Sequence, residues 1–277
     1  MKNLLLVIII LFSCKSISQN NFQLKSSEDS ITIKYANIYS NNILITSTDS
    51  LGYFNVNDKY VNTNIKITAL GYKTLNNIQL KSESTIFMEV EAIVLNEVIV
   101  SNQTKSKKKY KLGKAKSGNA GLVCTFGDKT ISQVAKFFQN KNENTTFLEK
   151  IKFKSFCSEK NRVLSIFVYS VDNDGMPDKI LNNEAIICNL KKGHNTYEIN
   201  LNQFNINFPE NGVYISLNYI LIEQNKCFGK LNKDWYYYEP SIDVNRTDNF
   251  IDTWYNVNGV WKKSETYSIS MELMITE

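Results

Sequence analysis

The chain has 277 residues, enough for two domains that each bury an apolar core. With 43 % hydrophobic residues, 3 prolines and 11 glycines, the composition excludes a collagen-like or largely disordered chain. The net charge of +5 at pH 7 is small and is concentrated in one short stretch, so no nucleic-acid-binding face is predicted. Isoleucine, tyrosine, phenylalanine and asparagine are abundant and alanine is scarce. This balance favours strands joined by polar turns, and we predict an all-β protein made of two β-sandwiches.

Residues 1–18 have the pattern of a secretory signal peptide. Lys2 precedes an apolar run, residues 4–12, that is too short to span a bilayer. Small residues before Gln19 fit cleavage by an ordinary signal peptidase, whereas the tetrapeptide that ends at Cys14 is similar to a lipoprotein box. Both alternatives predict export to the periplasm, outer membrane or cell surface. The second adds attachment to a membrane through a lipid on Cys14.

Residues 19–100 are expected to form the first sandwich, because turn signals separate short apolar runs throughout this region. The most specific stretch is residues 48–56. There Asp49 and Ser50 can bond their own backbone, and Gly52 can supply the positive φ of a tight turn. We interpret this turn as a β-hairpin and the polar residues 19–30 as a short lead-in. The expected strands are residues 31–39, 43–46, 53–56, 65–69, 75–80, 86–90 and 95–100.

Four motifs of this region resemble, in the same order, the carboxypeptidase regulatory-like domain. They are Tyr35-Ala36-Asn37-Ile38, residues 48–54, residues 65–72 and Leu95-Asn96-Glu97-Val98-Ile99-Val100. That family has a transthyretin-like sandwich, which also precedes the plug of many TonB-dependent receptors of Bacteroidetes. The resemblance implies a folding or interaction module without catalytic residues in a cell-envelope protein of such bacteria.

Residues 101–118 contain seven lysines and no acidic residue. They show no apolar periodicity, so we predict a solvated linker between the two domains. Attraction of these lysines to an anionic surface polymer or to lipid headgroups is the alternative.

Residues 119–277 are predicted to form a second, jelly-roll-like sandwich. Residues 131–138 also fit helical spacing, but a strand is favoured because strands surround them. The other expected strands are residues 148–157, 163–169, 184–190, 195–201, 212–222, 252–257 and 267–276. The runs 168–177, 197–201 and 208–215 are similar to a C-terminal sandwich that often follows the regulatory-like domain in envelope proteins. This likeness implies no particular activity.

The four cysteines beyond the signal peptide all lie in the second domain: Cys124, Cys157, Cys188 and Cys227. An oxidising compartment would allow disulfides among them. Cys157 and Cys188 lie in apolar, strand-like runs, where a free cysteine behaves as a small core residue. We therefore expect buried thiols, although spacing does not define the connectivity of a bridge.

The sequence offers little for catalysis. His194 is the only histidine, whereas a zinc carboxypeptidase site needs two. A hydrolytic triad would have to use His194, and no Gly-x-Ser-x-Gly motif accompanies it. An exposed turn histidine is the simpler interpretation. There is also no Gly-rich phosphate loop, CxxC pair or nucleotide fingerprint, so we predict no catalytic residues and no cofactor.

One acidic segment is a weak candidate for calcium. Asp172 and Asp174 precede Gly175, as oxygen ligands do in calcium loops. The twelfth position from Asp172 is Asn183 instead of the bidentate acid that such loops need, although Glu184 follows it. A β-turn between two strands is the favoured alternative.

Aromatic residues crowd the C-terminal part, and we select Trp235, Tyr237, Trp254 and Trp261 as candidate ligand-binding residues. Exposed rings can stack on sugars or peptides, whereas alternating aromatics in strands mostly fill cores. Since Tyr236, Tyr237 and Tyr238 are consecutive, they cannot all point inward from a strand. Asp234, Glu239, Asp243 and Asn256 lie close enough in the sequence to bond sugar hydroxyls.

These features predict a non-enzymatic binding or scaffolding protein of the cell envelope. Its partner would be a glycan, a peptide or another envelope protein, and not a nucleic acid. The alternative is a glycan hydrolase that uses Asp and Glu residues of the second sandwich. Spacing alone does not select the pair of carboxylates that such an enzyme needs.

Overall fold

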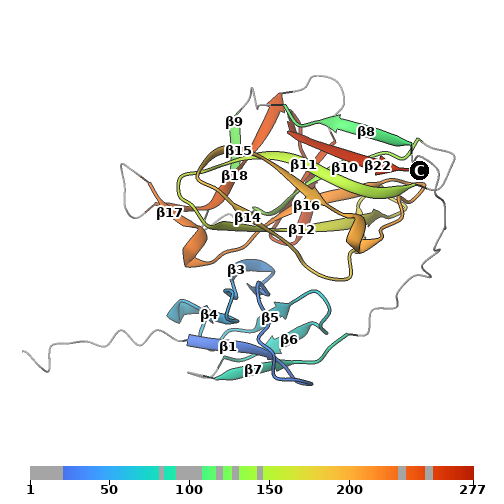
Figure 1. The fold of residues 1–277 in the computed structure, drawn as a ribbon. Coiled ribbons are helices and arrows are strands. Elements are labelled where there is room, and N and C mark those ends of the chain that lie inside the picture. The colour runs from blue at the N-terminus through green and yellow to red at the C-terminus, as the bar shows by residue number, and fades with distance from the viewer. Residues whose placement is uncertain are drawn as a thin grey trace, which may run out of the picture.

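The computed structural model is built almost entirely of strands (Figure 1). The residues that it describes are 21–80, 84–91, 108–116, 121–126, 131–141, 146–229, 235–246 and 252–277. Within these residues there is no α-helix, only strands and three short 3-10 turns, so the all-β prediction is confirmed. A helix with the length and hydropathy of a membrane span does not occur in the described ranges. The predicted signal peptide with Cys14, and the predicted strand 95–100, lie outside them.

The first sandwich packs a three-stranded sheet on a four-stranded one (Figure 1, lower part). The first sheet has the order β4-β1-β7, with β1 Asn21–Ser26, β4 Tyr53–Asn55 and β7 Thr85–Met88. The second has the order β3-β2-β5-β6, with β2 Asn37–Ser40, β3 Ile43–Ser47, β5 Ile65–Thr68 and β6 Leu75–Ile78. Phe22, Leu24, Ile38, Ile65, Ile67 and Met88 are almost completely buried between the sheets.

Two predictions for this region are wrong. Residues 21–26 are not a lead-in but the central strand β1, because Phe22 and Leu24 alternate with polar residues and point into the core. Residues 31–39 do not form one strand, since Ser30 and Tyr35 adopt left-handed φ values of 60° and 58°. Regular pairing therefore begins only at Asn37.

The turn at Asp49–Gly52 forms as predicted, but it does not close a hairpin. Asp49 Oδ1 accepts hydrogen bonds from the backbone N–H groups of Leu51 and Tyr53, at 2.8 and 2.9 Å. Gly52 has φ +76°, and a Cβ there would lie 2.9 Å from the carbonyl oxygen of Leu24. The strands on either side belong to different sheets, because β3 pairs with β2 and β4 pairs with β1. The turn thus carries the chain from one sheet to the other.

The second sandwich joins a seven-stranded and an eight-stranded sheet (Figure 1, upper part). The seven strands are β10 Ile131–Phe138, β12 Arg162–Val171, β13 Pro177–Ile180, β14 Ile186–Leu190, β16 Val213–Tyr219, β19 Thr253–Val257 and β20 Val260–Lys263. The eight are β8 Lys109–Lys114, β9 Gly121–Phe126, β11 Phe147–Cys157, β15 Gly193–Asn200, β17 Lys226–Phe228, β18 Tyr236–Arg246, β21 Tyr267–Ile269 and β22 Met271–Thr276. The strand predicted at residues 131–138 is confirmed as β10.

Part of the predicted linker belongs to this sandwich. Residues 109–114 form β8, which pairs antiparallel with β22 at the edge of the larger sheet. Tyr110 and Leu112 pack against the core, while Lys109 and Lys111, which alternate with them, are exposed. Lys109 Nζ lies 2.6 Å from Glu149 Oε1. The solvated-linker interpretation is therefore wrong for residues 109–114, because they pair with β22 and place Tyr110 and Leu112 against the core. Residues 101–107 lie outside the described ranges.

The two sandwiches contact each other through the end of β3. The N–H of Ser47 donates to the carbonyl oxygen of Leu221 at 3.0 Å, and the N–H of Leu221 donates to Ser47 Oγ at 3.1 Å. Leu44 is part of the core of the larger sandwich, and Tyr35 packs against a cluster around Val163. Apolar packing and paired backbone groups thus join the two sandwiches.

All four cysteines of the second domain are free, as expected. Cys157, Cys188 and Cys227 are buried, and Cys124 is half-buried. Burial raises the pKa of the Cys157 and Cys188 thiols to about 12. These two thiols are therefore neutral core side chains near pH 7.

Candidate ligand-binding site

The structure separates the four candidate aromatic residues into two pairs on different sheets. Trp235 and Tyr237 lie at the start of β18 in the larger sheet, whereas Trp254 and Trp261 lie on β19 and β20 of the other sheet. Trp235 is 50 % exposed, while Trp254 and Trp261 are only partly exposed. The four aromatic residues therefore do not form a single binding surface.

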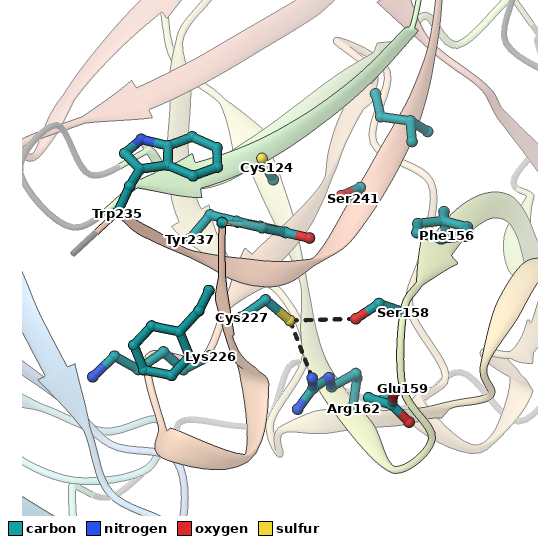
Figure 2. A pocket seen from close by; sticks show the side chains of 13 residues that line it. Cys124, Phe156, Ser158, Glu159, Arg162, Lys226, Cys227, Trp235, Tyr237 and Ser241 are labelled. Atoms are coloured by element: carbon teal, nitrogen blue, oxygen red, sulfur yellow. Dashed lines mark hydrogen bonds between the residues drawn. The ribbon is translucent and has the colours of Figure 1, made fainter. Parts of the chain in front are cut away.

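Trp235 and Tyr237 line a cavity of about 640 Å³, which we call the aromatic pocket (Figure 2). Three segments that are distant in the sequence form its walls. They are residues 122–124 of β9, residues 156–162 around the β11–β12 connection, and residues 226–229 and 235–241 on and beside β17 and β18. A volume of this size lies within the range typical of small-molecule sites.

The rings at the pocket present apolar surface to solvent. Trp235 lies 5.3 Å from Phe126 and 5.6 Å from Tyr237, measured between ring centroids. The N–H of Gly229 donates to the carbonyl oxygen of Trp235 at 2.8 Å, which holds the backbone of Trp235 in place. Leu122 and Phe228, which also line the pocket, are 45 % and 58 % exposed. A contiguous group of exposed apolar side chains is typical of a binding site on a protein surface.

A buried ion pair lies behind this aromatic surface. Glu239 is completely buried, and its Oε2 accepts a hydrogen bond from Arg162 Nε at 3.0 Å. The backbone N–H of Ser158 donates to Oε1 at 2.7 Å. Arg162 Nη2 also donates to Cys227 Sγ at 3.1 Å (Figure 2). The pair thus ties the β11–β12 connection to β17 and β18.

Three side chains that line the pocket, Cys124, Cys227 and Tyr237, are not activated as nucleophiles. Burial raises the pKa of the Cys124 thiol to about 11, and burial also raises the pKa of Cys227. Burial likewise raises the pKa of the Tyr237 phenol to about 12. All three groups are therefore neutral near pH 7, where a thiolate would be needed for nucleophilic chemistry.

Trp254 and Trp261 instead cover a small packed cluster. Trp254 meets Tyr214 edge-on at 6.2 Å, and Trp261 meets Tyr169 edge-on at 5.9 Å. Tyr214 and Tyr169 are only 2 % and 8 % exposed, although they lie on the outer side of their sheet. A hollow of about 290 Å³ lies beside Trp254. The two tryptophans thus bury part of their surface against these tyrosines, which matches the alternative that aromatic residues in strands fill cores.

Asp172 organises a tight turn between β12 and β13. Its Oδ1 accepts hydrogen bonds from the N–H groups of Asp174 and Met176 at 2.9 and 2.7 Å. These bonds are those of a tight turn, so the β-turn alternative accounts for the acidic segment. In the part of the chain that the structure describes, no three His, Cys, Asp or Glu side chains gather as metal ligands.

His194 is exposed as predicted, but it lies in strand β15 and not in a turn. Its Nε2 lies 2.6 and 2.7 Å from the two carboxylate oxygens of Asp243, which is completely buried. Phe156, which lines the aromatic pocket, lies nearly perpendicular to the imidazole of His194, with ring centroids 6.5 Å apart. His194 and Asp243 themselves do not line the cavity.

The residues expected to bond sugar hydroxyls are not available to do so. Glu239 is buried in an ion pair with Arg162, and Asp243 is buried against His194 Nε2. Asn256 Oδ1 accepts hydrogen bonds from Ser132 and Gly259. Asp234 lies outside the described residues. The polar side chains that do line the pocket include Ser158, Arg162 and Ser241. Sequence reasoning missed them, because only the fold brings them beside Trp235.

Comparison with known proteins identifies no relative. No protein-family model matches the chain, and no curated protein matches its sequence. One similar solved structure contains the cysteine protease and lectin-like domains of Cwp84, a surface layer associated protein of Clostridium difficile. It gives a TM-score of 0.41 at 9 % identity over 83 % of this chain and 45 % of that chain. Another, the T=1 particle derived from infectious bursal virus, gives 0.30 at 12 % identity over 91 % of this chain and 52 % of that chain. The chain thus spans about half the length of these structures.

Proposed function

We propose that this protein is a non-catalytic binding protein of the cell envelope that holds a carbohydrate at the aromatic pocket. The observation that carries the proposal is Trp235, which leaves half of its surface in solvent beside Tyr237 and Phe126. Exposed rings on a fixed backbone offer flat apolar surface to the faces of sugar rings. The hydroxyls of Ser158 and Ser241 supply polar groups on the same cavity.

The carboxylates around the pocket favour binding over hydrolysis. A glycosidase needs one carboxylic acid and one carboxylate that both reach the substrate. Glu239 is completely buried, with both oxygens hydrogen-bonded. Glu159 lines the pocket, and Lys192 Nζ lies 3.2 Å from its Oε1. Glu159 is thus the one carboxylate among the described lining residues, and a single carboxylate does not make the pair that hydrolysis requires.

A glycan array with the purified protein, followed by calorimetry on the sugars that bind, tests the proposal. We expect Trp235→Ala to weaken binding at least about tenfold, since loss of a central aromatic anchor costs about 2 kcal/mol or more of binding free energy. Trp254→Ala is the matched control on the other sheet and should bind as the wild type does. A peptide array with the same two variants tests the other class of ligand.

Three results would contradict the proposal: an array without any bound glycan, equal affinities of wild type and Trp235→Ala, or a preference for peptides over all sugars. A reducing-sugar assay on the bound glycan is expected to detect no cleavage. Cleavage that is lost in Glu159→Gln would identify the glycan hydrolase instead.

A further inference from the structure

Arg162 has hydrogen-bonding capacity that the protein itself does not use. The residue is 8 % exposed and lines the aromatic pocket. A guanidinium carries five N–H donors. One on Nε bonds Glu239 and one on Nη2 bonds Cys227, and no acceptor among the described residues bonds Nη1. Nη1 is not among the described side-chain atoms that are both buried and unpartnered, so it is accessible to solvent on a residue that lines the pocket.

Neighbouring groups hold this guanidinium in a fixed orientation. Glu239 accepts from Nε, and the Ser158 N–H fixes the other oxygen of the same carboxylate at 2.7 Å. Cys227 holds Nη2 from the side of β17. A planar guanidinium fork held in this way matches a carboxylate, because two parallel N–H groups can bond its two oxygens.

The aromatic surface and the guanidinium belong to one site. Trp235, Tyr237 and Arg162 line the same cavity (Figure 2). The charges of Glu239 and Arg162 both influence the pKa of the Tyr237 phenol, which places that ring within electrostatic reach of the ion pair. Apolar rings around the guanidinium lower the local dielectric constant and strengthen its attraction for an anion.

We propose that the sugar bound in the aromatic pocket is acidic, of the uronic-acid type. Its carboxylate bonds the free N–H groups of Arg162, and its ring lies on Trp235 and Tyr237. This inference rests on the proposed function, whose ligand class it narrows. The rim does not oppose an acidic ligand, since Glu159 pairs with Lys192 and Glu223 pairs with Lys226, at 3.2 and 3.0 Å.

The test compares two ligands that differ only in charge: an oligouronate and its methyl ester, of equal length. We expect the wild type to bind the free acid at least about tenfold more tightly than the ester, as a charge-assisted bidentate contact predicts. The double variant Arg162→Gln/Glu239→Gln removes both buried charges together. It should bind acid and ester equally, with an affinity that still depends on Trp235.

Lys192→Gln and Lys226→Gln separate Arg162 from the rim. Lys192 forms an exposed ion pair with Glu159, and Lys226, which lines the pocket, is half-buried and paired with Glu223. Both variants should keep the preference for the acid, because the inference assigns the carboxylate to Arg162. Equal binding of acid and ester by the wild type would overturn the inference and leave the proposed function intact. A preference that disappears in either lysine variant would overturn it as well, even if the double variant does not fold. Absence of any sugar binding would refute both proposals.

Discussion

The most direct test of the architecture behind the aromatic pocket is the substitution Glu239→Gln. This carboxylate is completely buried, accepts from Arg162 Nε at 3.0 Å and accepts from the Ser158 N–H at 2.7 Å. Glutamine keeps the size of the side chain and one accepting oxygen. It removes the negative charge that compensates a guanidinium whose side chain is only 10 % exposed.

The expected loss of unfolding free energy follows from the buried Arg162 guanidinium, which the substitution leaves without its counter-charge. Removing one partner of a buried ion pair destabilises a protein by about 3–5 kcal/mol. Because the amide oxygen of glutamine can still accept one hydrogen bond, we expect about 3 kcal/mol. For a chain of this length that corresponds to a fall of about 6–12 °C in Tm. Urea unfolding and differential scanning calorimetry measure the two quantities.

A double-mutant cycle isolates the ion pair from other effects of the substitution. Arg162→Gln alone should cost about as much as Glu239→Gln, because it leaves a buried carboxylate unpaired. The double variant should lie within about 1–2 kcal/mol of the wild type, since no charge is left uncompensated. The exposed pair Lys73–Glu89, at 2.8 Å, is the control, and Glu89→Gln should leave Tm unchanged. Additive single effects, or a Glu239→Gln protein as stable as the wild type, would refute this reasoning.

Further substitutions at two glycines, one asparagine and one cysteine test other parts of the fold. Gly212 has φ +89°, and an added Cβ would lie 2.4 Å from a carbonyl oxygen of β10, so Gly212→Ala should cost about 3 kcal/mol in urea unfolding. Gly175→Ala, at φ +78° with open space around it, should cost only about 1–2 kcal/mol. Asn225 is completely buried and bonds three backbone groups, so Asn225→Ala should cost about 2–4 kcal/mol and speed amide exchange at the start of β12. Burial raises the pKa of Cys157 and Cys188 from 9.0 to about 12, so the unfolded chain loses these protons first as the pH rises. The free energy of unfolding should therefore fall above about pH 9, by about 1.4 kcal/mol per pH unit for each thiol, and Cys157→Ala should flatten that slope in urea titrations.

Strand prediction succeeded where apolar residues recur over many positions. The strand expected at residues 148–157 corresponds to β11, in which buried apolar residues alternate with less buried ones. The strand expected at residues 163–169 corresponds to β12, an apolar run that is buried on both faces. Prediction failed for β1, which has only two core residues and is placed by β4 and β7 from later in the chain. Strand β18 was missed because Pro240 follows its run of aromatic residues and interrupts the strand pattern. In the structure, Pro240 lies where the pairing of β18 with β9 shifts register. Local pattern does not reveal the partners that make such segments into strands.

The candidate site was only half predictable for a similar reason. Trp235 and Tyr237 stood out because an aromatic run in a strand must present some rings outward. Arg162 gave a weaker signal: it is one of only two arginines in a chain that otherwise uses lysine. Glu239 was expected to bond sugar hydroxyls, although an acid beside three tyrosines is also the pattern of a buried charge that needs a partner. More than 70 residues separate the two, and their pairing follows from the packing of the β11–β12 connection on β18.

The two aromatic faces of the larger sandwich differ in what covers the rings. On β19 and β20, Trp254 and Trp261 find tyrosine neighbours on the same sheet, and together they form a packed layer over small residues such as Ala135. At the start of β18, Trp235 has Phe126 and Tyr237 as its aromatic neighbours among the described residues and stays half exposed. Exposure of this kind costs free energy unless a ligand covers the ring. A ligand should therefore lie over the end of the β17–β18 pair and not over the centre of the opposite sheet.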